Sequence, residues 1–402
     1  MKLPLLTRPY YSRKNIWRFV LSYYAPYGLK QRLVKNLNDD ICAFLALVEA
    51  GLWGNEVQLL SFGPIDFKEI YKIAESQSVV GLVSVGIGQA SDIRIPKEDV
   101  LSFVGATLQI EHRNVEVNDF LLKLSKKIHN AGVFSLLIKG QGIAQCYEKP
   151  LWRTAGDVDL LLDENNYEKA KSVLFPIAYD IQLEDRKKKH QALKIMGVEV
   201  ELHGKMHFTL SKRVDKELDI VIDDSLRRGG VCRLRVDETD VYLPNPDNHV
   251  IIVFTHYLHH FFIEGVGLRQ ICDWCRLLWT HRTELNVELL EHRLQKMGLI
   301  TEWKVFASLA VNTLGMPVEA MSFYDSRFKV KGERVLRRIL VCGNFGHNKD
   351  LSYRRKYTGI TYKIVATLRR FGDFVSLTPV FPLDAPRFLV AYLFNKAKGA
   401  EE

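Results

Sequence analysis

Apolar residues recur at helical spacing in the first third of the chain and again over its last two fifths, and they alternate at strand spacing only in between. One face of a helix repeats every three to four residues, whereas one face of a strand repeats every second residue. Asn38, Asp66 and Asp247 are well placed to cap helices of this kind. The pattern predicts helices at 41–48, 67–74, 97–127, 249–262, 268–279, 287–297 and 301–314.

The middle of the chain reads as strands with short helices between them. A helix at 141–147 follows the first strand, and a second, capped by Asn165 or Asn166, covers 167–174. The last eighty residues are expected to be helical, with interruptions at prolines. The predicted strands are 133–138, 157–162, 179–183, 191–196, 198–203, 231–236 and 241–243.

This succession predicts an α+β protein with a small mixed-sheet core. We expect a mostly helical N-terminal region at 1–125, the mixed-sheet core at 126–245 and a helical C-terminal domain with a basic tail at 246–402. A chain of 402 residues is long enough for two or three such units.

Two carboxylates stand on one face of the predicted strand at 157–162. Asp157 and Asp159 are two residues apart, so their side chains point the same way, and Val158 and Leu160 face the opposite side. A bound divalent cation commonly offsets the repulsion between two such acids. With 47 acidic residues in the chain, about five acid-x-acid matches arise by chance, so the surroundings must decide.

A Lys-Gly turn precedes this pair. Lys139 and Gly140 lie between a predicted strand and the helix that begins at Gln141. Glycine lets the backbone approach a phosphate closely, and the helix N-terminus behind it favours an anion. Lys139, Arg153 and the basic turn at 187–189 could steady a triphosphate.

A third carboxylate follows on a later strand. Glu199, Glu201 and His203 share one face of the strand at 198–203, opposite three apolar residues. Glu201 would complete a set able to hold two Mg²⁺ ions, with Mn²⁺ as a second candidate. Paired ions of this kind serve phosphoryl and nucleotidyl transfer.

The order of these motifs resembles the uncharacterised nucleotidyltransferase family of the DNA polymerase β superfamily. The resemblance covers about 120 residues. It implies Gly140 at the phosphate turn, with Lys139, Gln141 and Arg153 near the nucleotide, and Asp157, Asp159 and Glu201 as catalytic metal ligands. It further implies a polymerase β-like core that uses an NTP, ATP first among them, and an acceptor hydroxyl that the sequence does not identify.

Two other functions remain open. A glycosyltransferase also uses an Asp-x-Asp motif, but such enzymes place a substantial α/β region before it, and 1–125 reads as helical. A non-catalytic protein of the same fold, binding a nucleotide, RNA or membrane, is favoured by Gln141, which stands where the superfamily has Ser or Gly.

A histidine cluster lies outside these motifs. His256, His260 and Glu264 fall on one helical face, with His259 beside them and Asp273 on the next predicted helix. The glutamate of a His-Glu-x-x-His metal motif is missing, so we expect a polar patch between helices, or a contact to the nucleobase or the acceptor.

Six cysteines are scattered through the chain. Cys272 and Cys275 form a Cys-x-x-Cys pair within a helical run, and no second pair completes a zinc site, so buried, reduced thiols are expected.

The charge of +9 is concentrated at the two ends. Eight basic residues and no acid precede Asp39, and sixteen basic residues face seven acids from Ser322 onward. Such ends suit an RNA or an acidic membrane surface. With neither a signal sequence nor an apolar run of membrane-spanning length, the expected location is the cytoplasm, peripheral at a membrane if the basic ends bind one.

Overall fold

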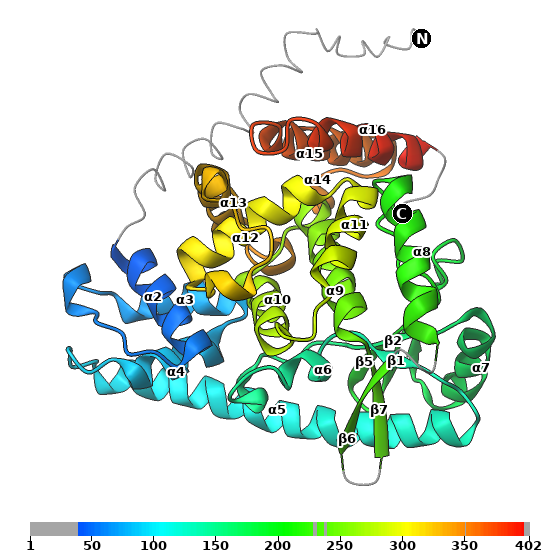
Figure 1. Cartoon of the computed structure of the whole chain (residues 1–402), viewed down its shortest axis with the longest axis horizontal. Coiled ribbons are helices and arrows are strands. Elements are labelled where there is room, and N and C mark those ends of the chain that lie inside the picture. Colours follow the sequence, from blue (N-terminus) through cyan, green and yellow to red (C-terminus); the bar gives the residue numbers. More distant parts are fainter. Residues whose placement is uncertain (1–38, 228–230, 237–238, 350, 398–402) are drawn as a thin grey trace, which may run out of the picture.

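The computed structural model describes residues 39–227, 231–236, 239–349 and 351–397, and the protein is α+β and mostly helical (Figure 1). The N-terminal basic segment and its predicted cap Asn38 lie outside the described residues. The longer helices are α2 (Asp39–Trp53), α3 (Phe67–Gln77), α4 (Val80–Gln89), α5 (Lys97–Asn130), α7 (Glu164–Leu174), α8 (Lys212–Leu226), α9 (Pro246–Ile263), α10 (Leu268–Thr280), α11 (Val287–Met297), α12 (Ile300–Leu314), α13 (Lys329–Cys342), α15 (Gly359–Leu377) and α16 (Asp384–Ala397); α6 (Gln141–Ala144) and α14 (Tyr353–Lys356) are single turns.

A five-stranded mixed sheet lies in the middle of the chain. Its order is β1-β2-β5-β4-β3; β2 and β5 are parallel, and the other neighbours are antiparallel. Two further strands, β6 and β7, form a separate antiparallel hairpin. The bounds are β1 (Leu136–Leu137), β2 (Val158–Leu161), β3 (Asp180–Ile181), β4 (His190–Ile195), β5 (Val198–His203), β6 (Val231–Val236) and β7 (Thr239–Pro244).

The two faces of the central strands differ as their alternation predicts. Leu160 and Val200 belong to a buried apolar cluster with residues of α5 and α7, which cover one face. Asp159 and Glu201 point to the other face, where Leu161 joins a second cluster that contains residues of α9. The polar residues of the sheet therefore meet α9.

Aromatic packing fixes the position of α9. Phe254 and Tyr257 of α9 pack against Trp274 of α10, and Trp274 meets Trp303 of α12 edge-on at 4.7 Å between ring centroids. All four side chains are fully buried, and burial of each large apolar side chain stabilises the fold by roughly 1.5–3 kcal/mol. Because this side of α9 is anchored in the helical core, His256 and His260 are held toward the sheet.

Several predicted elements are confirmed. Asp66 caps α3 by accepting the backbone N–H of Lys68 and Glu69, and α11 and β5 have the predicted bounds. Cys272 and Cys275 are fully buried free thiols of α10, as expected.

Other predictions of local structure are wrong. Asp163, rather than Asn165 or Asn166, caps α7, because its carboxylate accepts the N–H of Asn166. The helix therefore begins at Glu164, before the predicted start at residue 167. Asn245 rather than Asp247 caps α9, with Pro246 at the first helical position, where its missing N–H costs nothing.

Two other elements depart from the predicted pattern. The strand at 133–138 is reduced to Leu136–Leu137. Helix α8 occupies a stretch for which the pattern predicted no element. None of the helices in the described ranges is long and apolar enough to cross a bilayer.

Candidate active site

The register of β2 and β5 brings the three predicted carboxylates together. Asp159 lies directly opposite Glu201 on neighbouring parallel strands, and Asp157 immediately precedes β2. One carboxylate oxygen from each of the three lies within 4.8 Å of the others.

The Lys139-Gly140 turn packs against this group. Gly140 has φ 60° and ψ −120°, a conformation that side chains disfavour, and a Cβ there would lie 3.1 Å from the carbonyl oxygen of Asp157. The Lys139 ammonium lies 2.7 Å from Asp159 Oδ1 and 2.9 Å from His256 Nε2, and donates to both. The glycine therefore permits the close approach that delivers Lys139 to the carboxylates.

Asp159 is fully buried and only partly satisfied. His203 Nε2 donates to Asp159 Oδ1 at 2.9 Å, whereas Oδ2 is buried without a hydrogen-bond partner. Repulsion from Asp159, followed by burial, raises the pKa of Asp157. A bound cation would therefore relieve the repulsion between these two carboxylates.

Glu201 is held as an anion by two histidines. His190 Nε2 lies 3.2 Å and His203 Nε2 3.3 Å from Glu201 Oε2. Burial raises the pKa of Glu201, but the hydrogen bonds from these histidines outweigh it and lower the pKa well below its ordinary value. Burial likewise lowers the pKa of His203, and its bonds to Asp159 and Glu201 outweigh that effect and raise it to about 9.

The residues present suit a divalent cation. Burial lowers the pKa of Lys139, but Asp159, Asp157 and Glu201 together raise it above its ordinary value, so the ammonium stays charged. Three carboxylates against the two cations Lys139 and His203 leave uncompensated negative charge beside the orphan oxygen of Asp159. Carboxylate oxygens at this spacing are the ligands that Mg²⁺ and Mn²⁺ prefer.

The Arg153 guanidinium already forms an ion pair within the protein. Its Nε and Nη2 donate to the two oxygens of Asp273, both at 2.7 Å, and the Tyr147 hydroxyl donates to the same carboxylate. Burial disfavours the Arg153 charge, but Asp273 outweighs it and raises the arginine pKa. The predicted nucleotide role of Arg153 therefore competes with a buried bidentate ion pair.

Arg269 lies beside this pair and makes no ion pair among the described residues. Its Nη1 donates to the Thr154 carbonyl at 3.1 Å, and its Nε is buried without a partner. Burial, followed by the neighbouring charge of Arg153, lowers the Arg269 pKa. A Cβ on Gly156 would lie 3.7 Å from Arg269 Nη1, so the guanidinium lies close to the Asp157 strand.

The side chain of Gln141 points away from the carboxylates. Its amide nitrogen lies 2.6 Å from Asn118 Oδ1 and 3.1 Å from Asn114 Oδ1, both on α5, and the residue is buried. Gln141 therefore anchors α6 to α5, and only its backbone is available to a ligand at the turn.

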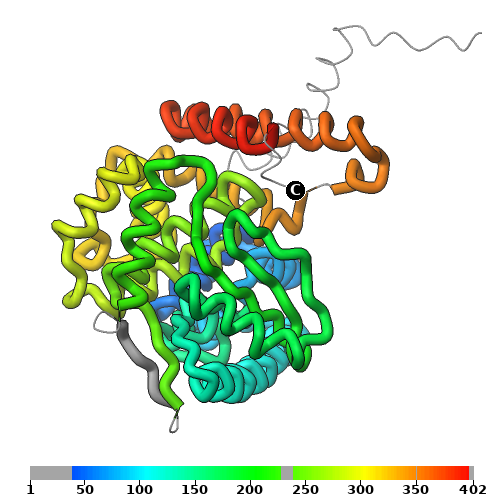
Figure 2. Tube along the Cα trace, turned by 90° about the vertical axis from the view of Figure 1, so that its right-hand side faces the viewer, coloured from blue at the N-terminus to red at the C-terminus, as the bar shows by residue number. Residues whose placement is uncertain are grey.

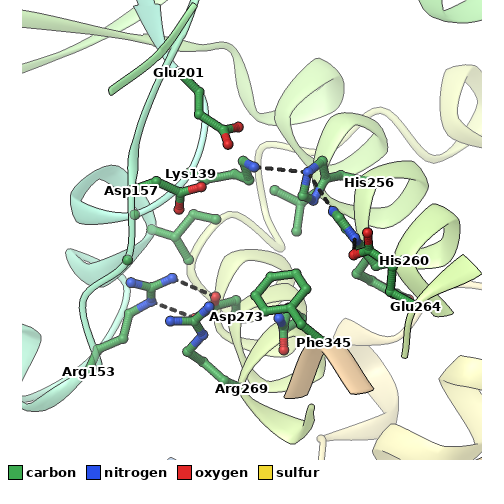
Figure 3. Close-up of a pocket in the computed structure, with 16 residues that line it drawn as sticks. Lys139, Arg153, Asp157, Glu201, His256, His260, Glu264, Arg269, Asp273 and Phe345 are labelled. Carbon is green, nitrogen blue, oxygen red and sulfur yellow. Dashed lines mark hydrogen bonds and ion pairs between the residues drawn. The ribbon is translucent and has the colours of Figure 1, made fainter. Parts of the chain in front are cut away.

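Two cavities of about 300 Å³ each meet at Glu201. We call them the arginine cavity, whose lining includes Lys139, Gly140, Arg153, Asp157, Arg269 and Asp273 (Figure 3), and the histidine cavity, whose lining includes Lys188, His190, His203, Lys205, His207 and His259. Residues common to both are Glu201, His256, His260 and Glu264.

The predicted cluster on α9 forms the wall between these cavities. His256 Nε2 lies 3.2 Å from His260 Nε2, and His260 Nδ1 donates to Glu264 at 2.8 Å (Figure 3). Burial, followed by the charge of Lys139, lowers the pKa of His256, which is why it can accept the bond from the ammonium. The expected polar patch is therefore connected to the carboxylates through Lys139.

The sequence interpretation missed Arg269 and His190. Arg269 and Asp273 are four residues apart on α10, so their shared helix face was a signal, but nothing local shows that Arg153 lies opposite them. His190 faces His203 across β4 and β5, a pairing that strand register alone determines. Of the basic turn at 187–189, Lys189 pairs with Glu164 and Lys188 lies 3.8 Å from Asp185.

Comparison with known proteins places the chain in a family. The profile of the uncharacterised nucleotidyltransferase family matches residues 63–315, which include the whole sheet and both cavities' carboxylates. Searches of curated proteins and of solved structures gave no significant match. The matched segment exceeds half of the chain, and on this match and the predicted motif order the protein belongs to the uncharacterised nucleotidyltransferase family and is a transferase.

Proposed function

We propose that the protein transfers the NMP group of an NTP, ATP first among them, to an acceptor hydroxyl at Asp157, Asp159 and Glu201. The observation that carries this is the orphan Oδ2 of the fully buried Asp159, aligned with Glu201 across two parallel strands. A buried carboxylate oxygen without a partner costs stability, and a metal ligand is the usual reason to retain one. A polymerase β-like arrangement of the sheet is part of the same proposal.

Asp157, Asp159 and Glu201 would hold Mg²⁺, two ions at full occupancy. When bound, the metal lowers the pKa of the attacking hydroxyl and neutralises charge on the triphosphate. Lys139 relieves the repulsion between the carboxylates through its bond to Asp159. Glu201 is kept ionised by His190 and His203, so it is ready as a metal ligand, and the hydroxyl proton passes to solvent.

The arginine cavity would hold the triphosphate. Gly140 lets the backbone at the start of α6 approach a phosphate, and Arg269 presents a guanidinium that no carboxylate neutralises among the described residues. Arg153 holds Asp273 in place and so sets the cavity wall. In the reaction the acceptor oxygen bonds to the α-phosphorus, the bond from that phosphorus to the β-phosphate bridging oxygen breaks, and pyrophosphate leaves.

The helical C-terminal domain would select the acceptor, because α9 supplies one side of both cavities and α10 lines the arginine cavity. A glycosyltransferase is less favoured, since α2 to α5 fill the described part of the region where such an enzyme carries its α/β nucleotide-binding unit. The basic residues near the two ends of the chain would contact an anionic partner.

Pyrophosphate release tests the proposal. Wild type and Asp157→Ala/Asp159→Ala are incubated with each α-labelled NTP, Mg²⁺ and a panel of hydroxyl compounds. We expect release and label transfer by wild type alone. Equal NTP binding by both proteins, without release by either, would remove the catalytic claim. Turnover of a sugar nucleotide that is lost in the double variant would establish the glycosyltransferase instead.

A further inference from the structure

The histidine cavity is bordered by cations that no structural role accounts for. Lys205 is exposed and makes no ion pair among the described residues, and Lys188 lies 3.8 Å from its only described acidic partner, Asp185. His207 adds a third polar group, paired with Asp219 at 3.0 Å.

Backbone contacts bring the two lysines to one rim. The N–H of Gly204 donates to the carbonyl of Lys189 at 2.8 Å, so the segment after β5 lies against the turn before β4. A Cβ on Gly204 would approach the Lys189 Cβ to 2.7 Å, which explains why glycine occupies this crossing. Lys188 and Lys205 flank this contact, one on each segment.

The acids of the same cavity are hydrogen-bonded to its histidines. Glu201 is bonded to His190 and His203, and Glu264 accepts from His260. His259 donates its Nδ1–H to the Phe208 carbonyl at 2.8 Å, which leaves its Nε2 as a hydrogen-bond acceptor. The cavity thus combines two lysines at the rim, one of them only weakly paired, with a hydrogen-bond acceptor for a hydroxyl on α9.

We propose, resting on the nucleotidyl transfer above, that the acceptor carries an anionic group, a phosphate or a carboxylate, beside the hydroxyl that reacts. The anion binds Lys188 and Lys205, and the hydroxyl reaches Glu201, where the two cavities meet. Charge-assisted hydrogen bonds of this kind are stronger than neutral ones, so they favour a charged acceptor over a neutral one.

Three-carbon probes test this directly. The full chain, with Mg²⁺ and a non-hydrolysable NTP analogue, is titrated calorimetrically with glycerol, glycerate and glycerol 3-phosphate. We expect at least one charged probe to bind tenfold or more tightly than glycerol, and the two charged probes separate carboxylate from phosphate. That preference falls below threefold in Lys188→Gln/Lys205→Gln and is retained in Lys212→Gln/Lys216→Gln, a pair of exposed lysines outside the cavity.

Equal binding of all three probes, or an equal loss in both lysine variants, overturns the proposal. Failure of the NTP analogue to bind is a separate result that counts against the proposed function. In that case the probes are titrated against the protein alone, and the same comparison of variants decides whether the cavity is an anion site.

A second, independent inference concerns the surface formed by the last two helices. Helices α15 and α16 form the outermost layer in both views (Figures 1 and 2). Exposed apolar side chains recur at helical spacing along this layer, and we call them the apolar stripe. They are 47–78% exposed: Ile360, Ile364, Phe371 and Val375 on α15, Leu383 just before α16, and Val390 and Phe394 on α16.

Both helices also pack against the body of the protein. Phe374 of α15 and Phe388 of α16 pack on the same residue, Phe262 of α9, at centroid distances of 6.0 and 4.9 Å. Residues 353–397 contain eight basic and two acidic residues, and both acids, Asp373 and Asp384, lie in ion pairs. The segment that carries the stripe therefore has an excess of positive charge, as do helices that lie on anionic bilayers.

We infer that the apolar stripe docks on an anionic lipid bilayer. The full chain is sedimented with vesicles of phosphatidylcholine alone and with added phosphatidylserine. We expect binding that needs the anionic lipid and weakens at least tenfold in Phe371→Ser/Phe394→Ser, but not in Leu101→Ser/Leu108→Ser, which changes exposed residues of α5. Unchanged binding in the stripe variant overturns the inference. The inference is also overturned if wild type binds no vesicles and instead forms a dimer that the stripe variant dissociates. Binding to RNA but not to vesicles overturns it as well.

Discussion

The arginine cavity and the histidine cavity share Glu201 but use their cations differently. In the arginine cavity Arg153 is locked to Asp273 by two hydrogen bonds, and the neighbouring Arg269 is left without a carboxylate. In the histidine cavity His190 and His203 lie within 3.3 Å of the Glu201 carboxylate, and Lys188 and Lys205 remain at the rim. A basic residue near an active site therefore indicates ligand binding only after its partners within the fold are known.

The largest effect is expected from breaking the Arg153–Asp273 pair. Asp273→Ala leaves a buried guanidinium uncompensated and should lower the free energy of unfolding by about 3–5 kcal/mol. Urea unfolding measures the loss, and Arg153→Met/Asp273→Leu, which removes both charges, should recover most of it. A loss under about 1 kcal/mol in Asp273→Ala contradicts the structural role.

Glu201→Gln tests the residue that the two cavities share. The variant keeps the shape but removes the ligand charge, so we expect pyrophosphate release to fall by about 10²–10³-fold, the scale for removing one preorganised electrostatic group. NTP affinity should fall much less than turnover, because Lys139, Gly140 and Arg269 still line the arginine cavity. Glu199→Gln, two residues away on the same face of β5, is the matched control and should retain activity.

Arg269→Gln tests whether Arg269, unlike the paired Arg153, binds the triphosphate. Loss of a charged hydrogen-bond donor to the triphosphate should raise the KM for NTP about 10- to 100-fold with normal folding. Steady-state kinetics give the value, with Arg282→Gln, beyond the end of α10, as the control. If KM stays unchanged while stability drops, Arg269 supports the cavity wall and does not contact the nucleotide.

The smallest effect concerns a histidine that supports the Lys139 turn. His249 Nε2 donates to the Ile138 carbonyl, and burial lowers its pKa from 6.5 to about 4. Below pH 6.5 the unfolded chain takes up a proton here that the folded chain refuses until the pH nears 4. The free energy of unfolding should therefore fall as the pH falls through this window, by up to about 1.4 kcal/mol per pH unit.

Thermal or urea unfolding at several pH values between these limits measures that slope. His249→Gln should flatten it, and His292→Gln, which changes an exposed histidine, should not. An unchanged slope in His249→Gln would show that other groups govern the acid sensitivity.

Much of the fold followed from periodicity. Elements with strong local signals, such as β5 and α11, have the predicted bounds, because alternation and capping are decided by neighbouring residues. The cap of α7 was misplaced, because Asp163 competes with Asn165 and Asn166 for the same role. The family profile covers the segment that contains Gly140, Asp157 and Asp159.

The candidate site was predictable only where alternation along a strand or a turn signalled it. Spacing paired Asp157 with Asp159, alternation on a later strand pointed to Glu201, and strand register brings the three carboxylates together. The partners of Arg153 and Gln141 were not predictable, since Asp273 and Asn118 lie on helices distant in sequence, and only packing decides which polar groups meet. Arg269 was missed for the same reason.

Mn²⁺ binding at the three carboxylates is the most direct test of the central claim. Water-proton relaxation is measured with Mn²⁺ and a non-hydrolysable NTP analogue for wild type, Asp157→Asn/Asp159→Asn and Glu199→Gln. We expect wild type and Glu199→Gln to bind Mn²⁺ more tightly when the analogue is present, and the double variant to lose at least tenfold in affinity. Equal Mn²⁺ affinity in all three proteins would contradict a metal-dependent nucleotidyl transfer at this site.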